Sequence, residues 1–573
     1  MIDVLPPGWL MMLGSPLLLL LPKKIRAYGV LVLSALSLLL FLALRPTTAS
    51  FPLFGLELQP VRIDSLSWPF VLVFHIAAIL SSIYSLHVSD WRQQVAGLVY
   101  AGSGIAAACA GDLISLFVFW ELTAISSVFL IWASDTRASY RSGMRYLIIQ
   151  VGSGVLLLSG AIIQFVQTSS IAFVGMAPEN SSLSLGAWLI LAAFAIKAAF
   201  PLLHNWLQDS YPQATVTGTV FLSAFTTKLA IYALARGFAG FDLLIGIGCI
   251  MTLFPILFAV IENDLRRVLA YSLNNQLGFM VVGIGIGTEL AINGTVAHAF
   301  CHIIYKALLF MSMGAVLYRV GTCKGTELGG LHKSMPWTTV FCIIGAGAIS
   351  GFPLLSGFVS KSMIISAAGE EHMLWVWLTL LVASAGVMEH SGIKIPFFAF
   401  FAHDSGKRVE EAPTNMLVAM GLAAALCVGL GIAYPLLYGI LPFNVSEHPY
   451  QPYTVPHVVA QMQLLSFAAL AFVFLIKFRL YPAEERATNL DTDWFYRKAA
   501  PKIVSVVGSA FGGLDKRIRS LMIAMLKWLS SRLQATFSEK GKLGKAWSTN
   551  AMAFWATFML VVALVLNYLN MQR

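Results

Sequence analysis

The chain has few charged residues and few cysteines, and these shortages exclude several classes of protein. Charged residues are 11% of its 573 residues, whereas a typical soluble domain has about 25%. Its six cysteines include no Cys-x-x-Cys pair, so the sequence offers no iron–sulfur, zinc or disulfide framework. We find no Walker A loop, serine triad or metal-ligand cluster, and we expect neither a cofactor nor a bound metal.

Long apolar runs dominate the rest of the sequence. Hydrophobic residues make up 58% of the chain, and a membrane-spanning helix needs about 20 mostly apolar residues. The net charge of +10 at pH 7 fits loops at a membrane surface better than a nucleic-acid site. The sequence therefore predicts an all-α polytopic membrane protein with about 14–16 transmembrane helices. The apolar segments are 8–21, 28–44, 67–87, 95–110, 112–133, 145–167, 184–203, 214–236, 241–262, 266–286, 291–318, 337–368, 373–402, 415–440, 457–477 and 551–569.

Basic residues gather in alternate loops between these segments. Lys23 and Lys24 follow the first segment, Arg137 and Arg141 precede the sixth, and Arg266 precedes the tenth. Loops rich in lysine and arginine face the cytoplasm by the positive-inside rule. We therefore expect these loops on the cytoplasmic side and the N-terminus outside.

Ionisable side chains lie inside segments that are otherwise apolar enough to cross a bilayer. A charged group at the bilayer centre costs at least about 2.5 kcal/mol, so it marks a functional site by default. Burial also disfavours the charged form of a lysine, which makes its protonation reversible near neutral pH. Together these groups predict a path for protons or ions; they are Glu121, Lys197, Lys228, His298, His302, Lys306 and Lys394.

Glu121 and Lys197 are the first candidates for a functional pair. A nearby carboxylate favours the protonated form of a lysine, so the lysine would release its proton when the two groups separate. The alternative for Glu121 is a structural ion pair or a hydrogen bond between helices.

The segment HAFCHIIYK places His298, His302 and Lys306 four residues apart, on one face of a helix. Histidine titrates near physiological pH, so the two rings can connect lysines through water. Packing is the alternative for each histidine, and snorkelling toward the headgroups is the alternative for Lys306. No acidic neighbour completes a zinc motif, so the spacing does not predict a metal site.

Two apolar segments contain Ile-Lys followed by a proline and phenylalanines. One reads AIKAAFPLLHNWL around Lys197, and the other reads GIKIPFFAFF around Lys394. Proline removes a helical hydrogen bond, and a matched pair of interrupted segments is typical of inverted repeats with a site at the membrane midplane. Two ordinary proline kinks are the alternative. A further break is expected at GFPLLSGF, residues 351–358.

Three polar residues near these segments have two interpretations each. His204 and Asp209 follow the first interrupted segment, where they either form an access mouth or cap a helix. Asp112 opens the segment that contains Glu121, and it either contributes to the path or only caps that helix.

The region after residue 480 differs from the rest of the chain. Apolar residues recur at helical spacing between Phe511 and Leu533, and basic residues occupy the other faces. This pattern predicts an amphipathic helix on the membrane surface or along a partner subunit, with a soluble surface helix as the alternative. Gly512 and Gly513 are expected to begin or interrupt this helix.

Several long motifs resemble the antiporter-like proton-translocating subunits of Mrp-type cation/proton antiporters, complex I membrane arms and membrane-bound hydrogenases. The motifs lie within residues 95–400 and read FVFWELTAISSVFLIW, FPLLHNWLQDSYPQATVTGTVFLSAFTTKLAIYALAR, NDLRRVLAYSLNNQLGFM and HAFCHIIYKALLFMSMGAVLY. The resemblance implies two inverted five-helix repeats, each with a broken helix, and a hydrated axis of charged residues. Gln208 departs from the family, in which a proline is common after Trp-Leu.

The resemblance also implies residue roles and domain limits. By this resemblance Glu121 is the first-channel glutamate and Lys197 is the broken-helix lysine. Lys228 is the bridging lysine, His298 and His302 are the connecting histidines, and Lys394 is the terminal lysine. The expected domains are N-terminal helices (1–94), a first repeat (95–240), a second repeat (241–405), C-terminal core helices (406–480), a cytoplasmic-side amphipathic segment (481–550) and a terminal transmembrane helix (551–573).

The function implied is that of a proton-translocating subunit in a multisubunit Mrp-type antiporter, which exchanges Na+ or another monovalent cation for protons. Such a chain is a secondary transporter subunit and not an enzyme. We expect it in a prokaryotic plasma membrane, with other membrane subunits, the bilayer, protons and monovalent cations as partners and no nucleic acid. The alternatives are a proton-pumping subunit of a complex I-like or hydrogenase-like redox complex, the membrane partner of an inorganic-carbon uptake complex, and a scaffold whose charges only hold helices together.

Overall fold

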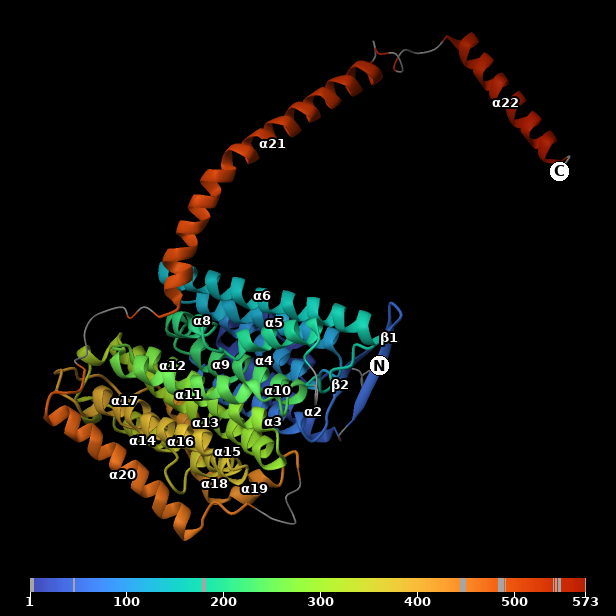
Figure 1. Cartoon of the computed structure of the whole chain (residues 1–573). Coiled ribbons are helices and arrows are strands. Elements are labelled where there is room, and N and C mark those ends of the chain that lie inside the picture. Colours follow the sequence, from blue (N-terminus) through green and yellow to red (C-terminus); the bar gives the residue numbers. More distant parts are fainter. Residues whose placement is uncertain are drawn as a thin grey trace. The chain divides into compact units, whose positions relative to one another are not determined.

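The computed structural model describes residues 5–44, 47–177, 182–443, 450–482, 489, 491–538, 541, 544 and 548–571. The chain divides into two compact units, Met1–Asn489 and Leu490–Arg573. The first unit is a bundle of helices around an extensive apolar core, and Figure 1 shows many of them lying side by side.

The first unit begins with short helices and a β-hairpin. Its first elements are α1 (Trp9–Gly14), the 3-10 helix η2 (Pro16–Leu20), α2 (Lys23–Ala43), strands β1 (Thr48–Leu53) and β2 (Leu56–Arg62), and α3 (Ser67–Tyr84). The hairpin was not predicted. Its turn is made by Phe54 and Gly55, both with positive φ (49° and 79°), as the favoured two-residue hairpin turns require.

Two groups of helices follow, and they carry most of the predicted site residues. The first group consists of α4 (Trp91–Cys109), α5 (Leu113–Trp132), α6 (Arg137–Thr168), α7 (Leu185–Lys197), α8 (Asn205–Ser210), η3 (Tyr211–Gln213), α9 (Gly218–Ala224) and α10 (Thr226–Gly237). The second consists of α11 (Leu243–Ile261), α12 (Leu265–Ile286), α13 (Glu289–Val320), η4 (Gly325–Glu327), η5 (Leu331–Lys333), α14 (Pro336–Ser350), α15 (Ser356–Glu370), α16 (Leu374–Val387), η6 (Met388–Ile393), α17 (Lys394–Pro396) and η7 (Phe397–Phe401). The unit ends with α18 (Thr414–Ile432), α19 (Tyr434–Tyr438) and α20 (Val455–Lys477).

Helix α13 connects the two groups. It packs against α3, α9 and α10 from earlier in the chain, and against α12, α14, α15 and α18. Of its most apolar 18-residue window, 94% is buried, so a polar residue on α13 lies in the interior of the unit whichever way it points.

The predicted membrane-spanning segments are confirmed as helices. Within the described residues, eleven helical segments are long and apolar enough to cross a bilayer, and three shorter apolar helices are Trp9–Leu20, Leu185–Lys197 and Pro336–Ser350. Each segment predicted from the sequence coincides with one helix or with two consecutive helices, except 373–402, which contains α16, η6, α17 and η7. The count depends on whether a broken helix is taken as one span or two.

Two linkers interrupt helices in the same way. Residues 198–204 separate α7 from α8, and residues 351–355 separate α14 from α15. Both contain Phe-Pro-Leu-Leu, and the first leucine of each is in the left-handed region, with φ of 70° at Leu202 and 71° at Leu354. Non-glycine residues seldom adopt this conformation, so its recurrence on an identical sequence marks a repeated element.

The segment around Lys394 is different, and here the predicted pairing of interrupted segments is wrong. No loop opens at Pro396. Instead, wide π-helical turns run on either side of Lys394–Pro396, over Met388–Ile393 and Phe397–Phe401. The structural counterpart of the Lys197 break is therefore the further break expected at 351–358.

The second unit consists of helical elements. It contains the π-helical turn η8 (Phe495–Ala499), the long helix α21 (Ala500–Phe537) and α22 (Thr549–Met571). The predicted amphipathic helix is present, but Gly512 and Gly513 lie inside α21 and neither begin nor interrupt it. The predicted terminal helix corresponds to α22.

Candidate functional site

The Lys197 ammonium group lies between α5 and α7. Its Nζ donates hydrogen bonds to the main-chain oxygen of Trp120 (2.5 Å) and to Oγ1 of Thr123 (2.8 Å), and it lies 4.2 Å from the Trp120 ring centroid. The Trp120 indole donates to Ser153 Oγ on α6 (2.9 Å), which donates to the Ala193 carbonyl on α7 (2.8 Å). These bonds tie the three helices together around the buried lysine.

Glu121 is near Lys197 but is not bonded to it. The two groups interact electrostatically, yet no ion pair within 4 Å joins them, and Glu121 Oε1 has no hydrogen-bond partner among the described residues. The two groups therefore interact without direct contact in this conformation, and their role as a proton switch stays a prediction. Glu121 directly follows Trp120, whose carbonyl accepts from Lys197.

Lys228 is held by the end of a short helix. Its Nζ donates to the Ser223 carbonyl (2.6 Å) in the last turn of α9, and the lysine itself lies in the first turn of α10. The helix axis is interrupted between them at Phe225. Carbonyl groups at a helix C-terminus carry partial negative charge and lack intrahelical donors, so they stabilise a buried cation.

The predicted face of α13 is confirmed. The rings of His298 and His302 stack with centroids 6.1 Å apart, and His298 contacts Ser360 Oγ (3.1 Å) and Gln276 Oε1 (3.2 Å). Both nitrogens of His302 and the Nζ of Lys306 are buried without hydrogen-bond partners among the described residues. Full burial of Lys306 excludes snorkelling. Buried polar atoms of this kind are normally satisfied by water or by a ligand.

Lys361 belongs with the histidines of α13, and the sequence-based prediction missed this lysine. Its Nζ donates to the Ile349 carbonyl (3.0 Å) in the last turn of α14, and it lies 5.3 Å from the Phe279 ring centroid. It interacts electrostatically with both His298 and His302. One signal was available: the lysine follows the second Phe-Pro-Leu-Leu, but flanking serines reduce the contrast between Lys361 and its surroundings.

Lys394 lies at the C-terminus of α11. Its Nζ donates to the carbonyls of Ala259 (3.2 Å), Val260 (2.8 Å) and Glu262 (2.7 Å). Burial raises the pKa of the Glu262 carboxyl, which lies in the loop after α11, and Arg267 at 3.5 Å opposes that shift. Lys394 also interacts electrostatically with the carboxyl group of Glu389 on η6, which is a second group able to exchange a proton.

Electrostatic interactions link the lysines and histidines from α10 to η6. Lys228 interacts with Lys306 and His302, and His302 interacts with Lys361. His390 on η6 continues the series, because it interacts with Lys306, Lys361 and Lys394. No hydrogen bond or ion pair between described residues joins Lys197 to Lys228, so the Glu121–Lys197 group forms a separate part of the site.

The three polar residues with two interpretations each, Asp112, His204 and Asp209, have structural partners. Asp112 caps α5, because its Oδ1 accepts from the N–H groups of Ile114 and Ser115 (2.8 Å each). Asp209 accepts two hydrogen bonds from Arg145 on α6 (2.7 and 3.0 Å). The His204 ring packs on Phe254 with centroids 4.6 Å apart. The capping interpretation of Asp112 is confirmed, and the access mouth at His204 and Asp209 stays a prediction.

Metal binding has no support in the part of the chain that the structure describes. There, no three or more histidine, cysteine, aspartate or glutamate side chains are grouped as a metal site requires. All six cysteines are buried and free.

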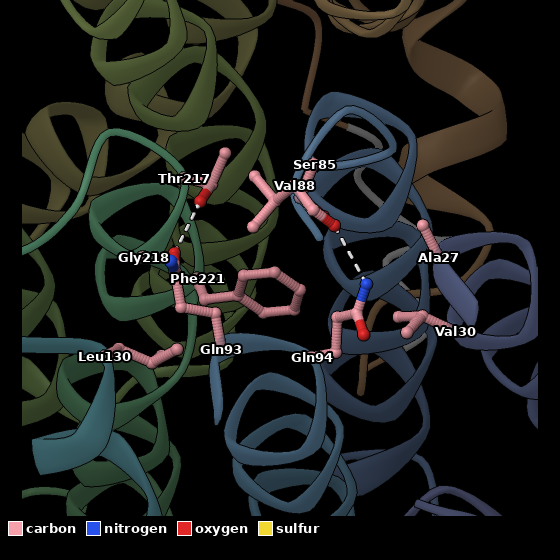
Figure 2. Close-up of a pocket in the computed structure, with 10 residues that line it drawn as sticks. All are labelled: Ala27, Val30, Ser85, Val88, Gln93, Gln94, Leu130, Thr217, Gly218 and Phe221. Carbon is pink, nitrogen blue, oxygen red and sulfur yellow. Dashed lines mark hydrogen bonds between the residues drawn. The ribbon is translucent and has the colours of Figure 1, made fainter. Parts of the chain in front are cut away.

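A small cavity near the start of α4 lies apart from these groups (Figure 2). In it Gln93 accepts a hydrogen bond from Thr217 Oγ1 (3.0 Å), and Gln94 donates to the Val88 carbonyl (2.8 Å). Its volume of about 10 Å³ admits no more than about one water molecule. None of the residues that line this cavity is ionisable, so the cavity is not part of the candidate proton-transfer site. The lining residues are Ala27, Val30, Ser85, Val88, Gln93, Gln94, Leu130, Thr217, Gly218 and Phe221.

Known proteins are similar to this chain in sequence and in fold. The family described as NADH:quinone oxidoreductase/Mrp antiporter, TM, matches residues 110–386. One Na(+)/H(+) antiporter subunit of Alkalihalophilus pseudofirmus is 32% identical over 343 residues, which cover 56% of this chain and 69% of that protein. Hydrogenase-4 component B of Escherichia coli is 27% identical over 419 residues, which cover 65% of this chain and 62% of that protein.

A solved structure supports the same fold. A chain of the Mrp complex from Dietzia sp. DQ12-45-1b superposes with a TM-score of 0.75 at 22% identity, over 92% of this chain and 62% of that one. The matches thus span less than two thirds of the Dietzia chain and of the E. coli component. The sequence match to the Alkalihalophilus protein, together with the matched membrane region, shows that the chain belongs to the family of NADH:quinone oxidoreductase/Mrp antiporter membrane subunits.

Proposed function

We propose that this chain is a proton-translocating subunit of a multisubunit monovalent cation/proton antiporter in a prokaryotic plasma membrane. Its work is secondary transport, so it needs no cofactor of its own. The other subunits of such a complex, the bilayer, protons and a cation such as Na+ are its partners. The Alkalihalophilus relative is named as an Na(+)/H(+) antiporter component, which supports this proposal.

The buried series of basic groups is the observation that carries the proposal. Lys228, Lys306 and Lys361 are each at most 2% exposed, and histidines of α13 lie between them. Like charges in a buried site repel each other, so protonating one group disfavours protonation of the next. A proton that arrives at one end therefore tends to displace a proton at the other.

Helix-end carbonyls keep this series from becoming a fixed set of ion pairs. A carboxylate bound to each lysine would hold its proton tightly, whereas a few carbonyl oxygens stabilise the ammonium form less. We propose that protons pass between Glu121 and Lys197, then by Lys228 and α13, and then by Lys361 toward Lys394. Asp112, His204 and Asp209 support helices and access, and they do not carry protons.

Ion exchange by the assembled complex tests this function. In proteoliposomes that report internal pH with a dye, Lys197→Ala and Lys361→Ala should each lower cation-driven proton movement about 100-fold, the scale of losing a proton-transfer group. Lys24→Ala is the matched control, because this lysine is exposed at the start of α2. Unchanged exchange in a correctly assembled Lys197→Ala complex would instead support a scaffold role.

A redox-driven pump is the second candidate, and one relative favours it. Hydrogenase-4 component B covers more of this chain than the Alkalihalophilus protein does, 65% against 56%. The same proton path would then be driven by electron transfer in partner subunits. Purification of the native complex separates the two: bound iron–sulfur clusters or flavin in a partner support the redox pump, and cofactor-free membrane partners support the antiporter.

A further inference from the structure

A basic cavity lies at the turn between α5 and α6, away from the proton-transfer residues. Its volume is about 670 Å³. Three arginines, Arg92, Arg137 and Arg141, line it together with one carboxylate, Asp135, and the aromatic side chains of this turn. The cavity therefore has an excess of positive charge that the proposed transport function does not use.

The only acidic group of the cavity lining is already neutralised. Arg92 donates to both oxygens of Asp135 (3.0 and 2.8 Å), and these hydrogen bonds lower the pKa of the Asp135 carboxyl. Asp135 thus stays ionised and bound to Arg92 over the physiological pH range. Neither Arg137 nor Arg141 has a hydrogen bond or an ion pair with any described residue.

The positions of Arg137 and Arg141 are electrostatically unfavourable for positive charges. Helix α6 begins at Arg137, so this arginine lies in the first turn, where the partial positive charge of a helix N-terminus disfavours cations. Arg137 and Arg141 are also four residues apart on one face, where like charges destabilise a helix. An anion in the cavity would remove both penalties at once.

The rest of the cavity fits a lipid better than a free ion. Trp132 and Tyr140 stack with centroids 5.9 Å apart, and such rings are enriched at membrane–water interfaces. Phe129 is 45% exposed in the last turn of α5, and the exposed apolar side chains of Ile148 and Val155 continue along α6. The basic groups thus lie at the end of an apolar surface long enough for acyl chains.

We propose that this cavity binds the phosphate headgroup of an anionic phospholipid from the cytoplasmic leaflet. The phosphate contacts Arg137 and Arg141, and the acyl chains lie along the exposed surface of α5 and α6. Arginine is suited to this role because its planar donors match phosphate oxygens. The location on the cytoplasmic side follows from the positive-inside rule.

Native mass spectrometry of the intact complex tests the proposal. The complex is titrated with phosphatidylglycerol and, separately, with phosphatidylcholine, and retained lipid is counted. Each basic residue near an anionic surface contributes about 1 kcal/mol, so Arg137→Gln/Arg141→Gln should weaken phosphatidylglycerol retention about 30-fold. The control Lys23→Gln/Lys24→Gln removes two exposed charges from the start of α2 and should leave retention within about twofold, the scatter expected for charges outside the site.

Two further measurements test the proposal if the double variant is not informative. If the double variant does not assemble, the single Arg141→Gln variant should still lose about fivefold, because one of two contacts remains. Inorganic phosphate is added to the complex in phosphatidylcholine nanodiscs as a separate probe. Equal phosphatidylglycerol retention by the arginine variants and the lysine control would overturn the proposal, and so would tight binding of inorganic phosphate without any preference for the anionic lipid.

Discussion

The buried lysines that donate hydrogen bonds share one kind of acceptor, the main-chain carbonyl group. Lys228, Lys361 and Lys394 each donate to carbonyls in the last turn or at the end of a helix, and the partner of Lys197 is a carbonyl of α5. The residue types and their burial could be predicted from sequence, since lysines stand out in apolar runs. Their partners could not, because the ends of α9, α11 and α14 are set by tertiary packing.

Gly154 on α6 positions the carboxyl group of Glu121. A methyl group at residue 154 would overlap that carboxyl, whereas a methyl group at Gly152, two residues earlier on the same helix, would meet no atom within 4 Å. Gly154→Ala should therefore displace Glu121 and lower proton movement in the dye assay at least about tenfold, as expected when a proton-transfer group is misplaced.

Gly152→Ala is the matched control for that substitution. Alanine has the higher helix propensity, so this variant should assemble normally and be as stable as the parent or up to ~1 kcal/mol more stable. Equal transport by the two glycine variants would show that the position of the Glu121 carboxyl does not matter.

Asp404 gives a pH-dependent contribution to stability outside the membrane. Hydrogen bonds from Arg408 and Lys333 lower the pKa of its carboxyl below the ordinary value. A carboxyl with a lowered pKa stabilises the fold fully above its unfolded pKa of about 3.9, and that contribution disappears as pH falls through the folded pKa. Because the group is exposed, the effect is small and is reduced by salt.

The comparison of the parent with Asp404→Asn tests this assignment by thermal unfolding. The difference in melting temperature should be constant above about pH 5 and should shrink below about pH 4. A difference that grew in acid would contradict the assignment.

At the scale of elements, a repeated broken helix is the feature that places the lysines. The two Phe-Pro-Leu-Leu linkers share a leucine with φ near 70°, so the same backbone path recurs in both groups of helices. The sequence predicted a break in each place but paired the wrong two, because Ile-Lys near a proline occurs in both Lys197 and Lys394 segments. Pro396 sits in a helix that widens into π turns, and proline alone does not distinguish that outcome from a loop.

The break between α14 and α15 depends on a close approach at Gly357. A methyl group there would overlap the Ala348 carbonyl in the last turn of α14, next to the carbonyl that binds Lys361. Gly357→Ala should therefore destabilise the protein by ~1–3 kcal/mol, as overpacking does. Gly429→Ala on α18 faces open space and should be neutral; a similar loss of melting temperature in both variants would rule out the contact as the cause.

Other elements show where sequence patterns fail. The hairpin β1–β2 follows from a Phe-Gly turn and an alternation of leucine with polar residues, but both signals are short and lie among apolar runs. Helix α21 passes through Gly512 and Gly513, since two glycines cost ~2 kcal/mol in a helix and many flanking helix-forming residues offset that cost.

At the scale of the whole molecule, the first unit is self-contained and the second is not. Core residues fill the first unit, whereas no side chain of α22 and none of α21 is buried within the described part of the chain. Within the second unit by itself, the apolar residues of α21 and α22 form no core, as is typical of helices that a bilayer or another protein surface covers.

Truncation after residue 489 tests this division. The shortened chain should keep the helical content and melting temperature of the first unit, because no part of its core is removed. It should also co-purify with partner membrane subunits at least about fivefold less well, the loss expected when an apolar contact of a few side chains is removed. Unchanged recovery of the whole complex would show that the second unit is not used in assembly.

Proton movement through α13 tests the central claim most directly. Lys306 lies midway in the linked series, so Lys306→Met should lower proton movement by the reconstituted complex about 100-fold while the complex assembles normally. Lys324→Met, which changes an exposed lysine just beyond the same helix, should leave it unchanged. Full proton movement in an assembled Lys306→Met complex would contradict a path through the buried lysines and histidines.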